Sequence, residues 1–185
     1  MSNVATNVST GKPRVSGAVF RAPIGTALPT DATSELNAAF KPMGFVSSDG
    51  LANDSSITSD EVKAWGGVIV YASQTDRTDK FKFVCLESLN LEVLKAFYGD
   101  DNVSGTLETG IHIKANNDEL GDHCWVFDMI LRGGVLKRIV VPDGRLSETG
   151  EVVYKDNDPI GYAMTITGMP DANGDTHHDY IKKSA

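Results

Sequence analysis

Short apolar segments that alternate with polar residues and end at turns containing glycine or proline recur along most of the 185-residue chain. In residues 79–86, apolar Phe81 and Phe83 alternate with Lys80 and Lys82, as in a strand with one buried face. Similar strand-like segments lie at 18–20, 43–47, 62–65, 68–72, 111–115, 123–131, 135–141, 152–155 and 160–167. This pattern predicts a mainly β fold, an antiparallel sandwich or a barrel-like sheet.

A single segment, about residues 89–98, has convincing helical periodicity in its leucine and aromatic residues. Ser88 or Asn90 can cap its start by accepting a hydrogen bond from a free backbone N–H. Gly99 can supply the left-handed residue that ends it. We therefore expect one α-helix flanking the sheet.

The length and spacing of these segments predict one folded domain with two polar ends. Residues 1–16 are expected to be a flexible arm, because they carry little apolar surface to bury. Residues 17–169 are expected to form the β domain, within which residues 46–75 form a long hairpin. Residues 170–185 are expected to be a polar C-terminal tail.

The charge of the chain restricts its partners. Twenty-five acidic residues against 17 lysines and arginines give a net charge of −8, so tight DNA binding is not expected. No segment resembles a signal peptide or reaches the length of a membrane span, which predicts synthesis in a cytoplasm and no membrane association.

Residues 17–30 combine a short apolar strand at 18–20 with prolines that a central strand excludes. Such a segment belongs at the edge of a sheet or outside it, where it can dock on another chain. Whether residues 18–20 pair within their own sheet or with a neighbour is left open. The candidate contacts between subunits are Val19, Phe20, Arg21 and Pro23 in this segment, and Asp49, Asp54, Asp60 and Glu61 in and beside the following acidic loop.

A search for catalytic, metal-binding and cofactor-binding groups predicts none. Cys124 and His123 are neighbours on one strand, so their side chains point to opposite faces and cannot act together. The chain has no C-x-x-C pair for zinc. Asp128 is the one carboxylate within an apolar strand; it is either buried alone, with a raised pKa, or paired with a cation such as Arg138.

Several of these segments resemble a known family. Residues 17–31 (GAVFRAPIGTALPTD) and 40–50 (FKPMGFVSSDG) are similar to the start of the major tail, or tail tube, proteins of phages with long non-contractile tails. The resemblance continues through 83–88 (FVCLES), the helix ending at 97–99 (FYG) and the strand at 160–167 (IGYAMTIT).

This resemblance implies a structural virion protein, made in the host cytoplasm, that assembles as stacked hexameric rings into the tail tube. Its implied partners are other copies of the chain, a tape-measure protein, the tail terminator, tail-tip or baseplate proteins and, in passage only, double-stranded DNA. An acidic lumen would repel phosphate and let DNA slide. Glu108 and Asp128, both expected in strands, are the candidate lumen-facing carboxylates.

An alternative function is a non-catalytic β-sandwich module on a virion that recognises a carbohydrate or a receptor. Such a module is expected to expose an aromatic platform. Trp65 and Trp125 both lie in expected strands, so the sequence gives this alternative little support.

Overall fold

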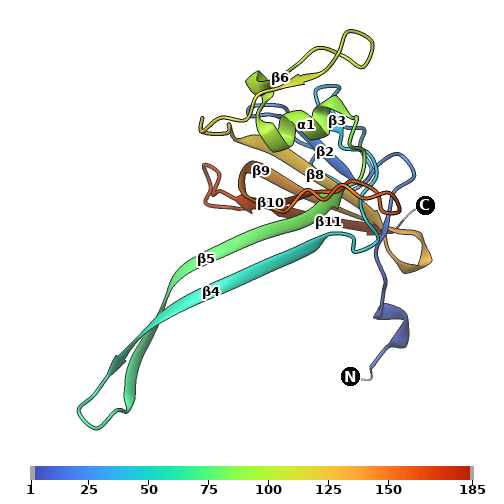
Figure 1. Cartoon of the computed structure of the whole chain (residues 1–185). Coiled ribbons are helices and arrows are strands. Elements are labelled where there is room, and N and C mark those ends of the chain that lie inside the picture. The colour runs from blue at the N-terminus through green and yellow to red at the C-terminus, as the bar shows by residue number, and fades with distance from the viewer. Residues whose placement is uncertain (1–2, 184–185) are drawn as a thin grey trace.

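The computed structural model describes residues 3–183 as a curved antiparallel sheet with one helix and a long projecting hairpin (Figure 1). The strands are β1 (Lys12–Pro13), β2 (Val19–Pro23), β3 (Lys41–Pro42), β4 (Ala52–Lys63), β5 (Ile69–Cys85), β6 (Val103–Ser104), β7 (His112–Ile113), β8 (His123–Ile130), β9 (Val135–Thr149), β10 (Tyr162–Gly168) and β11 (His178–Lys183). The α-helix is α1 (Leu91–Tyr98), and short 3₁₀ turns lie at Ala5–Asn7, Asp100–Asn102 and Arg132–Gly134.

The main sheet has the order β3-β2-β8-β9-β10-β5-β4, with β1 added beside β8 and β11 added beside β9. The 15-residue strand β9 pairs with three other strands of this sheet. Its first half lies between β8 and β11, and its second half pairs with β10. The sheet folds over so that β5 packs on β8, and Phe81 stacks on Phe127 with ring centroids 5.3 Å apart. The prediction of an antiparallel, sandwich-like β fold with one helix is confirmed, and strand pairing among the described residues does not close a barrel.

The principal core lies between the folded halves of the sheet and under the helix. Its buried residues come from β2, β5, α1, β6, β8, β9 and β10 and from the residue after β3: Val19, Met43, Phe81, Phe83, Cys85, Val93, Leu94, Ala96, Val103, Trp125, Phe127, Ile139, Val141, Tyr162, Met164 and Ile166. A smaller core lies on the other face of β8, where the segment between β2 and β3 covers Cys124, Val126 and Val140. Strand β8 is therefore buried on both faces, as its continuous apolar sequence indicates.

Helix α1 begins and ends where the sequence indicates. The Asn90 side chain accepts a hydrogen bond from the Glu92 N–H at 3.0 Å, and Gly99 follows the last turn with φ of 102°. The helix buries Val93 and Leu94 against the principal core.

Several expected segments differ from the structure. Residues 43–47 form no strand and contribute only an isolated bridge between Val46 and Cys85. Residues 68–72 and 79–85 belong to one continuous strand, β5, because pairing with β4 runs through the polar residues between them. Residues 152–155 form no strand and lie mostly exposed. In the segment 170–185, residues 178–183 form β11, since β9 offers a free edge along residues 135–140.

Candidate assembly surface

The hairpin of β4 and β5 projects away from the body of the molecule as a two-stranded ribbon (Figure 1). Every residue of β4 is exposed, and so are most residues of β5 before Asp79. The turn between the strands requires Gly66 and Gly67, whose φ values are 104° and 89°. A two-stranded hairpin is at best marginally stable alone in water, so this ribbon presents a surface suited to a covering partner.

The outer end of the hairpin is apolar, although it faces solvent. Its large exposed side chains are Val62, Trp65, Val68, Ile69, Val70 and Tyr71. Trp65 at the turn is as exposed as in an extended chain, at 106%. Apolar surface gathered at one exposed site marks a protein contact more often than scattered single residues do.

The base of the hairpin, unlike its exposed outer end, is anchored in the body of the molecule. The last residues of β5 place Phe81, Phe83 and Cys85 in the principal core. On the exposed face, Lys82 pairs with Asp54 across the hairpin at 3.0 Å, and Lys80 pairs with Glu148 of β9 at 2.7 Å. One strand thus joins a buried body to an exposed projection.

The acidic candidates for subunit contacts lie on or beside this hairpin. Asp54, Asp60 and Glu61 are exposed on β4, and Asp49 is exposed in the turn that precedes it. Only Asp54 has a cross-strand cation at hydrogen-bonding distance, whereas Glu61 lies 3.8 Å from Lys63. The structure therefore leaves these carboxylates accessible to a neighbour.

The candidates in β2 are placed mainly inside the chain's own fold. Residues 19–23 pair with β8, so this segment belongs to its own sheet. Val19 is buried in the principal core. Arg21 is also buried, which removes both residues from any outer contact surface in this structure. Phe20 is half-buried and Pro23 is exposed.

Arg21 takes part in a charged cluster at the end of the helix. Its guanidinium contacts Asp100, whose other carboxylate oxygen lies 2.9 Å from His123 Nε2. Burial by itself would raise the pKa of Asp100, but the His123 hydrogen bond and the Arg21 charge outweigh it and lower that pKa to about 2. The cluster ties β2, β8 and the residues after α1 together, a structural role that the sequence did not indicate.

Asp128 was expected to face the lumen, and the structure corrects this expectation. Its side chain is 3% exposed, and Arg138, its cross-strand partner, forms two hydrogen bonds to it at 2.6 and 2.8 Å. Arg14 of the N-terminal segment contacts the same carboxylate at 2.9 Å. The pairing with Arg138, one of the two alternatives left open by the sequence, is confirmed; a carboxylate buried and neutralised in this way presents no charge to a lumen.

Glu108 lies in the loop between β6 and β7 rather than in a strand, and it is exposed. A hydrogen bond from the Thr106 side chain lowers its pKa. Its carboxylate is therefore available at the surface, although the sequence misplaced it in a strand.

The C-terminal segment is fixed against the base of the hairpin by a buried carboxylate. Asp79 of β5 is fully buried, and its Oδ2 accepts a hydrogen bond from Thr176 Oγ1 at 2.6 Å. His177 lies 3.6 Å from the same oxygen and edge-on to Phe81. The contacts explain why a polar segment can return to the body and form β11.

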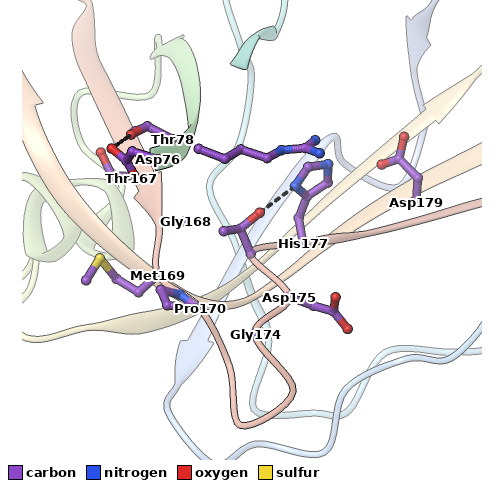
Figure 2. Close-up of a pocket in the computed structure, with 12 residues that line it drawn as sticks. Asp76, Thr78, Thr167, Gly168, Met169, Pro170, Gly174, Asp175, His177 and Asp179 are labelled. Atoms are coloured by element: carbon purple, nitrogen blue, oxygen red, sulfur yellow. Dashed lines mark hydrogen bonds between the residues drawn. The ribbon is translucent and has the colours of Figure 1, made fainter. Parts of the chain in front are cut away.

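A polar pocket of about 610 Å³ opens beside this contact (Figure 2). Figure 2 shows Asp76 and Thr78 from the hairpin on one side, joined by a 3.4 Å hydrogen bond, and Gly174 and Asp175 from the C-terminal loop on the other. Nearby, Asp171, Asp175 and His178 bring three possible metal ligands within 4.8 Å of one another. Asp171 Oδ1 already accepts two backbone N–H groups, which accounts for the local fold without an ion.

Among residues 3–183, no helix has the length and apolar character that a membrane span requires.

Comparison with family models matches residues 12–185 to the model described as Phage tail tube protein. Comparison with curated proteins finds no match.

Proposed function

Because the chain belongs to the phage tail tube protein family, and is therefore a structural protein of the virion tail, we propose that it polymerises as stacked hexameric rings. The rings form a tube around a tape-measure protein and later conduct the genomic DNA into the host. The chain is made in the host cytoplasm and joins the tail terminator and the tail-tip or baseplate proteins at the two ends of the tube. No catalytic step, metal or cofactor enters this proposal.

The observation that carries the proposal is the hairpin of β4 and β5. It projects with an apolar end that residues 3–183 leave exposed. Such a surface costs free energy in water, and burying it on a second copy recovers that free energy. The exposed acidic residues Asp54, Asp60 and Glu61 flank it and are candidates for polar contacts at the rim of the same interface.

The free edges of the sheet support ring formation. Among the described residues, β4 pairs only with β5, and β11 pairs only with β9, so each has one unpaired edge. Unpaired edges can add a strand from another chain. Because the two edges differ, their contact is head-to-tail, and a head-to-tail contact closes into a ring when its rotation permits.

The charge of the chain fits the passage of DNA. A surface with net charge −8 repels phosphate at short range and does not retain it. Exposed Glu108 remains a candidate for the lumen, and buried Asp128 is withdrawn. A tube with a strongly basic bore would contradict this part of the proposal.

Electron microscopy of the purified protein tests the proposal. Wild-type protein, concentrated and warmed, is expected to form rings or tubes of uniform width. Trp65→Ser, which removes the most exposed apolar side chain of the hairpin, is expected to stay folded by circular dichroism and to lose tubes. Trp65→Phe keeps an apolar ring and serves as the matched control. Wild-type monomers that persist even when tail initiator complexes are added would contradict the proposal.

A further inference from the structure

His123, at the start of β8, has both ring nitrogens beside hydrogen-bond acceptors. Its Nδ1 lies 2.9 Å from the carbonyl oxygen of Gly121, and its Nε2 lies 2.9 Å from a carboxylate oxygen of Asp100. A carbonyl oxygen and an ionised carboxylate have no hydrogen to donate. Both contacts are therefore hydrogen bonds only when both ring nitrogens carry a hydrogen, and the ring is then a cation.

The acceptor at Nε2 is a carboxylate that stays ionised. The folded pKa of Asp100 is about 2, so this side chain carries its negative charge at every pH at which a histidine ordinarily titrates. Arg21 contacts the other oxygen of the same carboxylate and holds it in place. In neutral solution, the hydrogen between Asp100 and His123 therefore comes from the ring.

The other three histidines are placed differently. His112 is exposed. His177 Nδ1 lies 3.2 Å from the Thr176 hydroxyl, which can donate or accept, so a neutral ring satisfies that contact. His178 Nε2 lies 3.9 Å from Asp171, beyond hydrogen-bonding distance. Only at His123 does the geometry require the second ring hydrogen.

The charges around His123 favour the cationic ring. Among the described residues, Asp100 is the one charged group in direct contact with it. Asp122, its neighbour in sequence, is held by Arg145 at 2.7 and 2.9 Å; this contact and, to a smaller extent, the ring charge lower the pKa of Asp122. The charged groups farther out are Arg21 of β2, Lys41 of β3, Glu92 and Lys95 of α1, Glu119 of the loop before β8, and Asp143 and Arg145 of β9.

Solvent reaches this ring. An open cleft of about 340 Å³ is lined by Arg21, Asp100 and His123 together with residues of β2, β3 and α1. The His123 side chain is 15% exposed. A proton can therefore leave the ring or return to it while the body stays folded.

The ring joins two segments that are distant in sequence. Gly121 lies in the loop of residues 114–122, between β7 and β8, and Asp100 follows α1. A neutral ring has a single N–H, and it keeps the stronger hydrogen bond, which is the one to the charged carboxylate. The lone pair of Nδ1 then faces the Gly121 carbonyl oxygen, so an attractive contact becomes a repulsive one.

We propose that His123 is a proton-dependent latch: as a cation it holds the loop of residues 114–122 to the end of α1, and loss of its Nδ1 proton releases that loop at Gly121. The signal is the pH of the solution, and the segment that responds is the loop. The latch acts within one chain and does not depend on tube formation.

NMR of the histidine ring nitrogens, recorded on the full chain as a dilute monomer, tests the latch. An ordinary imidazole, with a pKa of about 6.5, is about nine-tenths neutral at pH 7.5. At that pH we expect both nitrogens of His123 in the N–H form, with exposed His112 as the internal reference. At higher pH the Nδ1 hydrogen should leave first, and the signal of the Gly121 carbonyl carbon should move with it.

Two results of this titration would overturn the latch. A neutral His123 ring at pH 7.5 would show that the cation is not the resident form. A neutral ring that keeps its hydrogen on Nδ1 at high pH would show that the contact with Gly121 does not open.

Melting temperatures of His123→Gln give a second test. Glutamine can donate to Asp100 but does not titrate. The stabilisation by the cationic ring is fully present below the ordinary histidine pKa of about 6.5 and is lost as the pH rises through the value at which the folded ring loses its proton. The advantage of wild type over the variant should therefore be about 3 °C larger at pH 6 than at pH 9.5, a modest effect because Asp100 is partly exposed.

His112→Gln, at an exposed position, is the matched control and should differ from wild type by the same amount at both pH values. An advantage over His123→Gln that does not change with pH would contradict the latch. If His123→Gln does not fold, the titration of the wild-type ring decides by itself.

Discussion

Strand β5 belongs to two different environments within its 17 residues. Its last part, from Asp79 onward, pairs with β10, and as far as Lys82 also with β4, and it sends Phe81, Phe83 and Cys85 into the principal core. Its first part pairs with β4 alone and is exposed on both faces. The backbone pairing is alike in both parts, but only one of them has a second layer to pack against.

This contrast shows which part of the molecule stabilises the isolated chain. Burial of apolar side chains contributes most of the favourable free energy of folding, and β-pairing in water contributes little net free energy. The body should therefore fold by itself, whereas the hairpin would gain apolar contacts only from a neighbour in the proposed tube. Changes in the two parts of β5 should separate folding from assembly.

The largest effect is expected from Phe81→Ala in the body. Phe81 is fully buried and stacks on Phe127, so its removal leaves a cavity that the surrounding sheet cannot fill. The free energy of unfolding should fall by about 3–5 kcal/mol. Chemical denaturation measures it, and a loss below about 1 kcal/mol would mean that this part of β5 is not the core that holds the body.

An effect of intermediate size on stability is expected at low pH, where Asp100 in the body becomes protonated. Its folded pKa of about 2 lies below its ordinary value of 3.8, so its contribution is fully present above that ordinary value and is lost as the pH falls toward 2. Melting temperatures of wild type and Asp100→Asn should therefore differ most above pH 4 and converge near pH 2. Parallel curves across that range would show that the cluster with Arg21 and His123 adds no pH-dependent stability.

The smallest effect on folding is expected from Tyr71→Ser on the projecting part of β5. Tyr71 is 61% exposed and faces Val62 across the hairpin, so the unfolding free energy should change by less than about 0.5 kcal/mol. Tyr162→Ser, at a buried position on β10, is the matched control and should cost several times more. A large destabilisation by Tyr71→Ser would show that the hairpin is already packed in the isolated chain.

Local pattern was sufficient to predict several elements of the body. Alternation at 79–86 and 160–167 predicted the last part of β5 and β10, and the segment 123–131 predicted β8. Asn90 and Gly99 predicted the ends of the helix, because capping depends on nearest neighbours in the sequence.

The sites were predicted less well, because they depend on contacts between distant residues. Val19 and Arg21 were assigned to an outer contact, yet β8 lies beside them and buries them. Asp128 was assigned to the lumen and was also considered as a partner of Arg138. The register of β8 and β9 places Asp128 directly opposite Arg138, so the two form an ion pair. The clusters around Asp79 and Asp100 left no signal in the sequence, since their members lie up to about 100 positions apart.

The sequence by itself determined several strands of the body, the helix and the acidic, mainly β character of the chain, because alternation, capping residues and charge are local or additive properties. Tertiary structure alone decided which strand faces lie buried, which carboxylates are neutralised and how far the hairpin projects. These follow from the order and register of strands that are distant in sequence, and the free energy that sets this order is gained only when the two halves of the sheet pack together.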